Sequence, residues 1–369
     1  MEPHLPHGRL GLYIHVPWCL TRCPYCVFFA LPYSRKAFER YVTTLEQEKA
    51  LYLPIIDRPL SSVYFGGGTP SLLSATQINA ILSGLPLCED AEISLELNPI
   101  QITPGFVQQL ASTAVNRISL GVQSLDDTEL MLLGRKHKAA DIAPAIKLLR
   151  DGGFTNLSAD LIYGLPNSSA QLLAANLEQF LSLPIEHLSC YLLEISFSCA
   201  LAHLIGQIPP DEMLAEEYHL IRKMAADAGF AQYEISNFAR QGYQSRHNLL
   251  YWQGDDYLAL GASASGHFGG VKYQNPADID SHYQNVTAGI LFPESDNGRF
   301  EASDYIMMRL RLIEGLNFSE YHKRFGHSFG REAAIRKLQQ MGMLEQIKDG
   351  IRLSDDALFI SNAVIAELL

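Results

Sequence analysis

The stretch Leu12-Tyr13-Ile14-His15-Val16-Pro17-Trp18-Cys19, continued by Cys23-Pro24-Tyr25-Cys26, decides the fold of this chain. Its five apolar-rich residues from Leu12 to Val16 have the length of a buried strand, and the cysteines follow directly. Three thiolates on one short loop can hold three irons of a cubane and leave the fourth iron without a protein ligand. An open coordination position is typical of a centre that binds a substrate. The spacing therefore predicts a 4Fe–4S cluster on Cys19, Cys23 and Cys26.

A zinc site is the alternative for the same cysteines. His15 or a distant cysteine would complete it, because Cys3His zinc sites are common. The context favours the cluster, since a second strand ends in Gly66-Gly67-Gly68-Thr69-Pro70. Glycines let a backbone approach a ligand closely and present its amides and carbonyls to it.

Short apolar strands alternate with helical segments through the first two-thirds of the chain. After the first strand, we expect strands at residues 62–65, 92–97, 117–121, 157–163 and 187–193. Six β–α repeats with little hairpin signal predict an α/β fold with a parallel sheet, most simply a partial (β/α)6 barrel of the TIM type. Such barrels carry their sites at the C-terminal ends of the strands.

The pattern changes after residue 230. A polar, aromatic and glycine-rich segment at 237–270 lies between short expected strands at 231–235 and 271–273, and its length predicts a functional excursion. Helices near 302–312, 318–325 and 331–341 and a hairpin with an Asp349-Gly350 turn predict a small winged-helix-like α+β module. We therefore expect a barrel at 1–230, an extension at 231–298 and a C-terminal module at 299–369.

Composition limits the partners and the compartment. The chain has 369 residues, 28 Lys and Arg against 40 Asp and Glu, and a formal net charge of −12, which argues against a nucleic-acid partner. Three of the six cysteines are scattered, so no disulfide framework is expected and a reducing cytoplasm fits best. Neither a signal peptide nor an apolar run of about 20 residues is evident, while peripheral contact with the inner face of a membrane stays open.

Polar residues end three of the expected strands. Glu96, Gln123 and Asp160 each lie in an apolar stretch, where a carboxylate is costly unless it meets a partner. Each could cap a helix or pair with an arginine, but their equivalent heights favour a pocket for ribose hydroxyls and a cationic sulfonium. Arg135 could steer a ligand carboxylate there, although a lone arginine at a helix end is more often exposed to solvent.

With these motifs, nearly the whole chain resembles the radical-SAM family that contains oxygen-independent coproporphyrinogen III dehydrogenase and the HemW-type haem chaperones. The segments that match family motifs are 12–19, 64–70, 116–124, 160–166, 233–239 and 245–248. The resemblance implies that the open iron binds S-adenosylmethionine. It also implies that the residues around this ligand are Tyr13, Tyr25, Gly67, Gly68, Thr69, Glu96, Gln123, Arg135 and Asp160.

Three features distinguish the branches of this family. The dehydrogenases typically carry a fourth cysteine two residues after the third ligand and a longer N-terminal extension; here Phe28 takes that position and 18 residues precede Cys19. The run His247-Asn248-Leu249-Leu250-Tyr251-Trp252 matches the His-Asn-x-x-Tyr-Trp motif of the chaperones. An imidazole suits haem iron, so His247 is the expected haem ligand, although an isolated histidine is more often a hydrogen-bonded loop residue. Val27 departs from the polar residue common in the family.

The resemblance thus implies a haem chaperone that binds haem, a 4Fe–4S cluster and S-adenosylmethionine. It would transfer haem to respiratory or other haem proteins, including partners at the respiratory membrane, and it could act as a homodimer. The alternative is a coproporphyrinogen III dehydrogenase of porphyrin biosynthesis that uses a 5′-deoxyadenosyl radical. Radical modification of a nucleic acid, a third alternative, conflicts with the net charge. Whether the chain is an enzyme stays open at this point.

Overall fold

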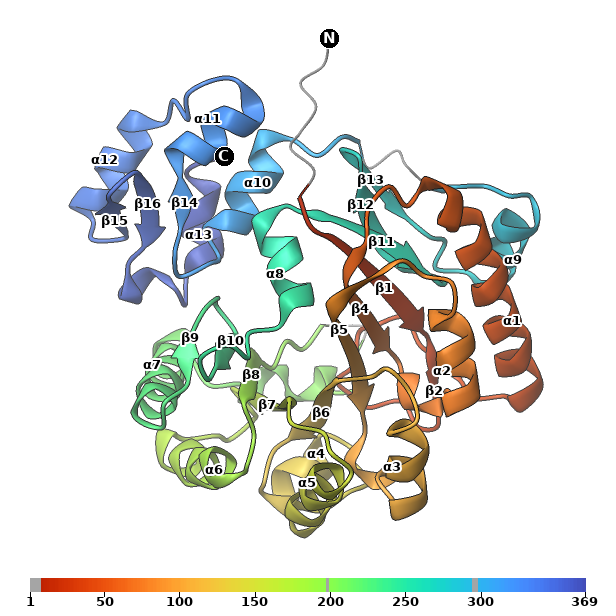
Figure 1. The fold of residues 1–369 in the computed structure, drawn as a ribbon. Helices are drawn as coiled ribbons and strands as arrows, with labels where there is room; N and C mark the ends of the chain where they lie inside the picture. The colour runs from red at the N-terminus through yellow and green to blue at the C-terminus, as the bar shows by residue number, and fades with distance from the viewer. Residues whose placement is uncertain (1–7, 197–198, 294–297) are drawn as a thin grey trace.

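A curved sheet of 11 strands forms the centre of the computed structural model, which describes residues 8–196, 199–293 and 298–369 (Figure 1). The order across the sheet is β13-β12-β11-β1-β4-β5-β6-β7-β8-β10-β9. Its strands are β1 (Leu10–Val16), β4 (Leu60–Gly67), β5 (Leu87–Leu97), β6 (Arg117–Gln123), β7 (Leu157–Tyr163), β8 (His187–Leu192), β9 (Ala231–Gln232), β10 (Asn237–Ala239), β11 (Asp256–Leu260), β12 (Ser265–Phe268) and β13 (Val271–Gln274). Two short strands of the cysteine loop, β2 (Trp18–Cys19) and β3 (Leu31–Pro32), pair separately.

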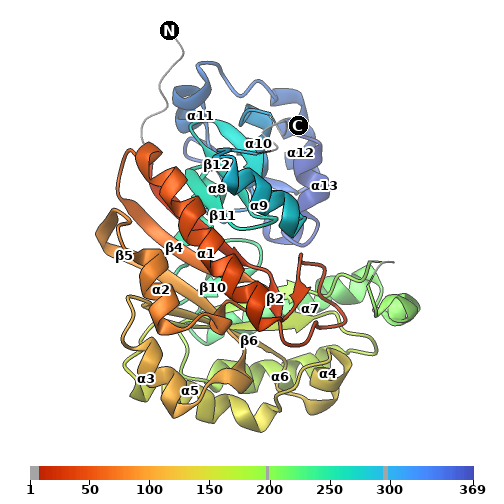
Figure 2. The same cartoon turned by 90° about the vertical axis from the view of Figure 1, so that its right-hand side faces the viewer.

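The six expected strands are present and neighbour one another in parallel, from β1 through β4, β5, β6 and β7 to β8. The α/β fold with a partial parallel barrel is therefore confirmed. Helices connect the strands and cover the outer face of the sheet (Figure 2). They are α1 (Arg35–Tyr52), α2 (Ala75–Leu82), α3 (Pro104–Leu110), α4 (Asp127–Leu132), α5 (Ile142–Asp151), α6 (Ala170–Ser182) and α7 (Asp211–Asp227).

The segment at 237–270 differs from the expected long loop. It contains β10, β11, β12 and a helix, α8 (Arg246–Gln253), and β11 pairs in parallel with β1, Leu12 facing Leu258. Strand β11 was not predicted, because its partner β1 lies near the start of the chain and local periodicity cannot reveal that pairing. The strand expected at 231–235 also ends early, at Gln232. One sheet takes strands from both sides of residue 230, so the boundaries at 230 and 298 stay predictions.

The C-terminal residues form a small module of helices and a three-stranded sheet beside α8 (Figure 1). The hairpin of β15 (Leu344–Ile347) and β16 (Gly350–Leu353) is present, but its turn is Lys348-Asp349. Gly350 is already in the strand, opposite Ile347, and the position requires glycine because a Cβ there would clash with the carbonyl oxygen of Leu316. The remaining elements are α9 (Ile279–Thr287), which packs on α1, then α10 (Ala302–Arg309), β14 (Leu316–Asn317), α11 (Phe318–Phe325), α12 (Glu332–Gln340) and α13 (Ser361–Ala366).

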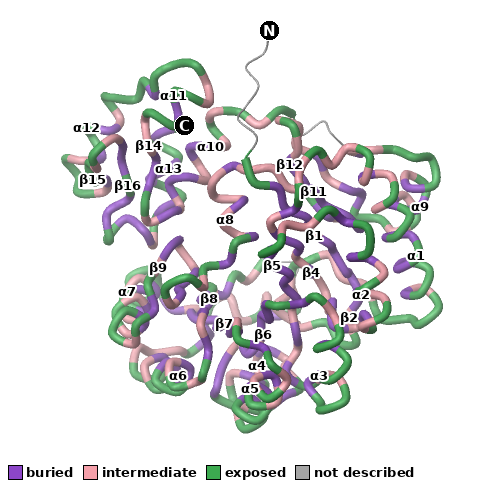
Figure 3. The backbone as a smooth tube through the Cα atoms, in the orientation of Figure 1, coloured by how far each residue is buried: buried purple, intermediate pink, exposed green. Residues whose placement is uncertain are grey.

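Buried residues are concentrated along the strands of the sheet (Figure 3). The apolar core lies between the sheet and the outer helices and includes Tyr41, Phe65 and Phe180. The inside of the curved sheet is unusually polar, with Glu92 and Arg117 both buried. Such buried charges need partners or a ligand, so the concave side is the place to look for a site. No helix in the described ranges is long and apolar enough to span a membrane.

Candidate functional site

A cavity of about 660 Å³ opens on the concave side of the sheet. Its walls combine the cysteine loop, the strand ends from β4 to β8, and Arg311, Phe359 and Asn362 near the C-terminus. The cavity brings together eleven of the expected site residues: Cys19, Cys23, Tyr25, Cys26, Gly67, Gly68, Thr69, Glu96, Gln123, Arg135 and Asp160.

The three cysteines lie on a loop that backbone hydrogen bonds hold in shape. The N–H of Cys26 donates to the carbonyl of Cys23 over 3.1 Å, and the N–H of Tyr33 donates to the carbonyl of Cys19 over 3.0 Å. All three thiols are free and half-buried. Burial is the largest cause that raises the pKa of the Cys19 and Cys26 thiols, and the neighbouring cysteines raise it further. A bound metal centre would relieve this crowding of negative charge.

The surroundings of the cysteines suit a cluster better than a zinc ion. Within the described ranges no three His, Cys, Asp or Glu side chains are placed to hold one ion. A cubane has no such requirement, since each thiolate binds a different iron. His15, the expected fourth zinc ligand, has its Nδ1 2.9 Å from the hydroxyl of Tyr13 and its Nε2 3.2 Å from the carbonyl of Phe29.

Glycines leave room beside the thiols. A Cβ on Gly68 would lie 3.0 Å from the Sγ of Cys19 and 2.9 Å from the carbonyl oxygen of Trp18. Gly67 has a φ of 113°, which other residues rarely adopt, and its N–H donates to Glu96 over 3.2 Å. The Gly-rich strand end thus keeps a space open next to Cys19 that any side chain would fill.

Arg135 links the cysteine loop to two strand ends. Its Nη1 donates to the Sγ of Cys23 over 3.4 Å, and its Nη2 donates to Asn98 over 2.7 Å and to the carbonyl of Gly121 over 2.6 Å. The Nε atom is buried and has no hydrogen-bond partner among the described residues. This arginine faces the cavity and keeps donor capacity for a ligand carboxylate.

Glu96 and Asp160 place two carboxyl groups inside the barrel. Burial, and then the charge of Asp160, raises the pKa of Glu96 to about 7. Burial likewise raises the pKa of Asp160 to about 6, against the hydrogen bond from Ser189. The hydroxyl of Tyr64 donates to Glu96 over 2.9 Å. A cation in the cavity would favour the ionised form of both groups.

Two further expected residues form other parts of the wall. Gln123 has a φ of 72°, a left-handed conformation that is costly for a residue other than glycine and that turns the end of β6. Tyr25 packs beside Leu133 and Leu193 in a small apolar cluster. Burial is the main cause that raises the pKa of the Tyr25 hydroxyl, so this group is a neutral hydrogen-bonding partner.

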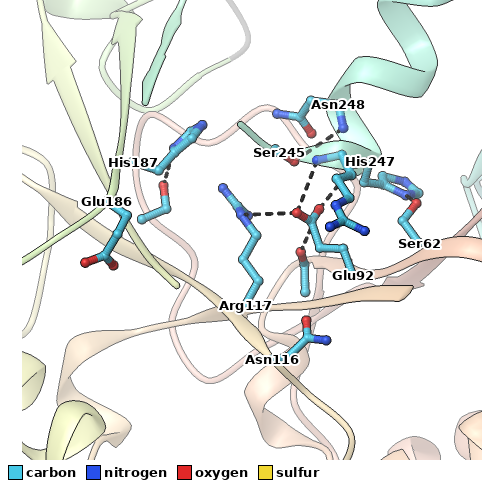
Figure 4. A network of polar contacts seen from close by, with 12 residues as sticks. Ser62, Glu92, Asn116, Arg117, Glu186, His187, Ser245, His247 and Asn248 are labelled. Atoms are coloured by element: carbon cyan, nitrogen blue, oxygen red, sulfur yellow. Dashed lines mark hydrogen bonds and ion pairs between the residues drawn. The ribbon is translucent and has the colours of Figure 1, made fainter. Parts of the chain in front are cut away.

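Tyr13 and His247 are not among the residues that line the cavity. His247 is buried; its Nδ1 lies 2.8 Å from the hydroxyl of Ser62 and its Nε2 2.7 Å from the hydroxyl of Tyr251. Tyr13 and Tyr64 pack on its ring, at centroid distances of 6.4 Å and 5.2 Å. Burial, and then the charge of Arg117, lowers the pKa of His247 to about 3. Figure 4 shows His247 at the side of the polar network, next to Ser62.

The sequence reasoning missed several residues of the cavity wall. Arg117, Tyr64 and Asn248 belong to motifs that match the family, but no function was predicted for these three side chains. A signal for Arg117 existed, because it starts an apolar strand in which every second residue faces the same side. The other cavity residues without an assigned role include Asn98, Ser119, Ser189, Tyr191, Ser236 and Arg311.

Comparisons with known proteins agree with this geometry. Residues 13–177 match the radical SAM superfamily and residues 301–360 match the HemN C-terminal domain. "Heme chaperone HemW" of Bacillus subtilis is 30% identical over 97% of this chain and 98% of its own length, and that of Mycobacterium tuberculosis is 32% identical over 99% and 96%. The mitochondrial radical S-adenosyl methionine domain-containing protein 1 of Bos taurus is 33% identical over 98% and 87%.

A solved structure shares the fold. Coproporphyrinogen III oxidase (HemN) from Escherichia coli superposes with a TM-score of 0.83 at 21% identity, over 99% of this chain and 91% of that one. The likeness includes the C-terminal module as well as the barrel, since nearly the whole of both chains is covered.

Proposed function

Because this chain belongs to the HemW family of radical-SAM proteins, we propose that it is a haem chaperone that carries a 4Fe–4S cluster and S-adenosylmethionine and transfers haem to other proteins. The family implies the cluster and S-adenosylmethionine. One observation supports the proposal most directly: the three cysteines, Arg135 and the polar strand ends face a single cavity.

Different residues of the cavity are placed to bind different parts of S-adenosylmethionine. When bound, the cluster supplies an iron that takes the amino-acid end of this ligand. Arg135, beside Cys23, is placed to pair with the ligand carboxylate. Glu96 and Asp160 lie deeper in the same cavity, where carboxylates can accept ribose hydroxyls and favour a cationic sulfonium. Gly67 and Gly68 leave the backbone edge free for close approach.

The haem ligand that we propose is His247, and the structure sets a condition on it. Both ring nitrogens are engaged, one with Ser62 and one with Tyr251. Iron can therefore bind only after the ring leaves at least one of these partners. Asn248, the next residue on α8, already lines the cavity. The His247 side chain therefore needs only a short movement to reach the cavity.

Haem titration followed by absorbance tests the proposal. Wild-type protein, reconstituted anaerobically with its cluster, is compared with His247→Ala, with Tyr251→Phe and with the exposed control His203→Ala. We expect His247→Ala to lose the wild-type spectrum and at least about tenfold in affinity, because a coordinate bond is removed. Tyr251→Phe frees Nε2 and is expected to bind haem as well as wild type or better. An unchanged spectrum in His247→Ala would make the assigned ligand wrong, and a wild type without haem binding would refute the chaperone.

Delivery of haem is the second half of the proposed function. We propose recipients among haem proteins of the respiratory membrane, contact with that membrane from the cytoplasmic side, and a homodimer as the working unit. Transfer is measured by mixing haem-loaded protein with inverted membrane vesicles that lack haem and following the recipient spectrum. Sedimentation with and without S-adenosylmethionine tests the dimer. Recipients that stay without haem would contradict transfer.

A coproporphyrinogen assay separates the chaperone from the related enzyme. Phe28, where the dehydrogenases carry a fourth cysteine, is 65% exposed at the mouth of the cavity. No sulfur is available there as a further ligand. We therefore expect no conversion of coproporphyrinogen III under reducing, anaerobic conditions with S-adenosylmethionine. Turnover in this assay would show that the chain is an enzyme.

A further inference from the structure

The cavity has a deep end that the family-based assignment leaves without a role. Along β6, Arg117, Ser119, Gly121 and Gln123 alternate with buried apolar residues, and all four line the cavity. At about 3.3 Å per residue, the two ends of this row lie roughly 20 Å apart. Gly121 contacts Arg135 beside the cysteines, so Arg117 lies far from the cluster.

Arg117 is a buried cation without a close ion-pair partner. Its side chain is 2% exposed, and its Nε atom is buried without a hydrogen-bond partner among the described residues. The nearest carboxylate oxygen belongs to Glu92 and lies 4.0 Å from Nε, at the limit of an ion pair. A guanidinium has five N–H donors, and leaving a buried one without an acceptor is costly. Arg117 thus has the features of a group that waits for an anion.

Glu92 does not supply that anion, because its oxygens are already shared. It accepts the backbone N–H of Arg246 over 3.2 Å and the backbone N–H of His247 over 3.2 Å, at the first turn of α8. Figure 4 shows Glu92 between Arg117 and α8. The deep end of the cavity therefore adjoins the helix that carries His247.

We propose that Arg117 binds a carboxylate of the ligand held at the deep end of the cavity. The inference rests on the proposed function, which supplies this carboxylate as a propionate of haem. The amino-acid carboxylate of S-adenosylmethionine, which we assign to the cluster end and Arg135, is the alternative that a second set of titrations tests. Arg135 provides a carboxylate partner at the cluster end, so the two arginines serve opposite ends of one cavity. A single Glu92 contact joins the carboxylate site to the backbone of the expected haem ligand.

Metal-free porphyrins test the proposal without help from iron coordination. Protoporphyrin IX and its dimethyl ester are titrated by fluorescence into the full-length protein. Wild type is expected to prefer the free acid by about tenfold to a hundredfold, the usual range for a hydrogen bond between charged groups. Arg117→Gln should abolish the preference and Arg117→Lys should keep part of it. Arg352→Gln, on the exposed hairpin, is the matched control and should behave like wild type.

A second set of titrations identifies which ligand supplies the carboxylate, and a paired variant controls for misfolding. S-adenosylmethionine and methylthioadenosine, which has no carboxylate, are titrated into wild type and Arg117→Gln. A weaker S-adenosylmethionine affinity with unchanged methylthioadenosine affinity assigns the carboxylate to S-adenosylmethionine. Because Arg117→Gln leaves Glu92 without a cation, the pair Glu92→Gln with Arg117→Gln is measured alongside.

Different results would refute the haem-chaperone proposal and the Arg117 proposal. Absence of porphyrin and haem binding to wild type refutes the chaperone, and the S-adenosylmethionine arm then decides the role of Arg117 alone. The Arg117 proposal is overturned when folded Arg117→Gln protein, single or paired, changes neither the preference for acid over ester nor the affinity for S-adenosylmethionine.

Discussion

The Nη1 atom of Arg135 donates to the Sγ atom of Cys23 over 3.4 Å, although 112 positions separate the two residues. This contact joins the loop after β1 to the segment after β6. It places a fixed positive charge beside the thiol of Cys23 and leaves the arginine facing the cavity.

Replacement of Arg135 by glutamine should weaken S-adenosylmethionine binding by about tenfold or more, because a charge-assisted contact to the ligand carboxylate is lost. Calorimetry on the reconstituted protein measures the affinity. The exposed neighbour Lys136→Gln is the matched control and should bind as wild type does. Equal affinity in Arg135→Gln and wild type would show that another group holds the carboxylate.

Each of Cys19→Ala, Cys23→Ala and Cys26→Ala should abolish the 4Fe–4S cluster, since a cubane with one iron open to substrate has no spare protein ligand. Visible absorbance and the iron and sulfide content after anaerobic reconstitution measure it. Cys88→Ala, half-buried on another strand, should keep the full content. A variant of the triplet that retains the wild-type content would remove that cysteine from the ligand set.

His187 should make the protein less stable in mild acid. Its ring is buried, with Nδ1 2.7 Å from Ser158 and Nε2 2.8 Å from Tyr233. Burial, and then the charge of Arg117, lowers the pKa of His187 well below its usual value. The unfolded ring takes up a proton near pH 6.5. The contribution of His187 to the free energy of unfolding is therefore constant above that pH and falls below it, by at most about 1.4 kcal/mol per pH unit.

Urea unfolding at pH 7.5 and 5.5 tests this acid sensitivity. We expect His187→Gln to lose less stability between the two pH values than wild type does. His203→Gln, which changes an exposed ring, should match the wild-type loss. Equal losses in His187→Gln and wild type would contradict a role for His187 in the pH dependence.

Alanine substitutions at two glycines distinguish the cost of backbone strain from the cost of steric crowding. Gly164 (φ 72°) and Gly84 (φ 78°) both adopt the left-handed conformation, where alanine costs about 1–2 kcal/mol. A Cβ at Gly84 meets nothing within 4 Å, whereas at Gly164 it would lie 2.4 Å from a methyl of Leu192. Gly164→Ala should therefore destabilise the protein by about 1–3 kcal/mol more than Gly84→Ala, as measured by urea unfolding. Equal losses would mean that Leu192 moves aside freely.

Local sequence patterns were sufficient for the parallel half of the fold. The strands from β4 to β8 carry apolar residues at alternate positions, and this periodicity can be read in each strand without knowing its partner. The capping box of Ser74 and Gln77 at the start of α2 is likewise a local pattern, since both groups lie within one turn. By contrast, β11 escaped detection because its neighbour β1 is distant in sequence.

The sequence by itself determined the cysteine triplet, the β–α repeat and the set of polar strand ends, because each depends on spacing within a short segment. Only the tertiary structure decided that His247 is buried between Ser62 and Tyr251 and that Arg117 lies at the deep end of the same cavity as Cys19. Those relationships depend on how α8 packs against the sheet and on how far the sheet curves. Both follow from contacts between distant residues, which no local pattern encodes.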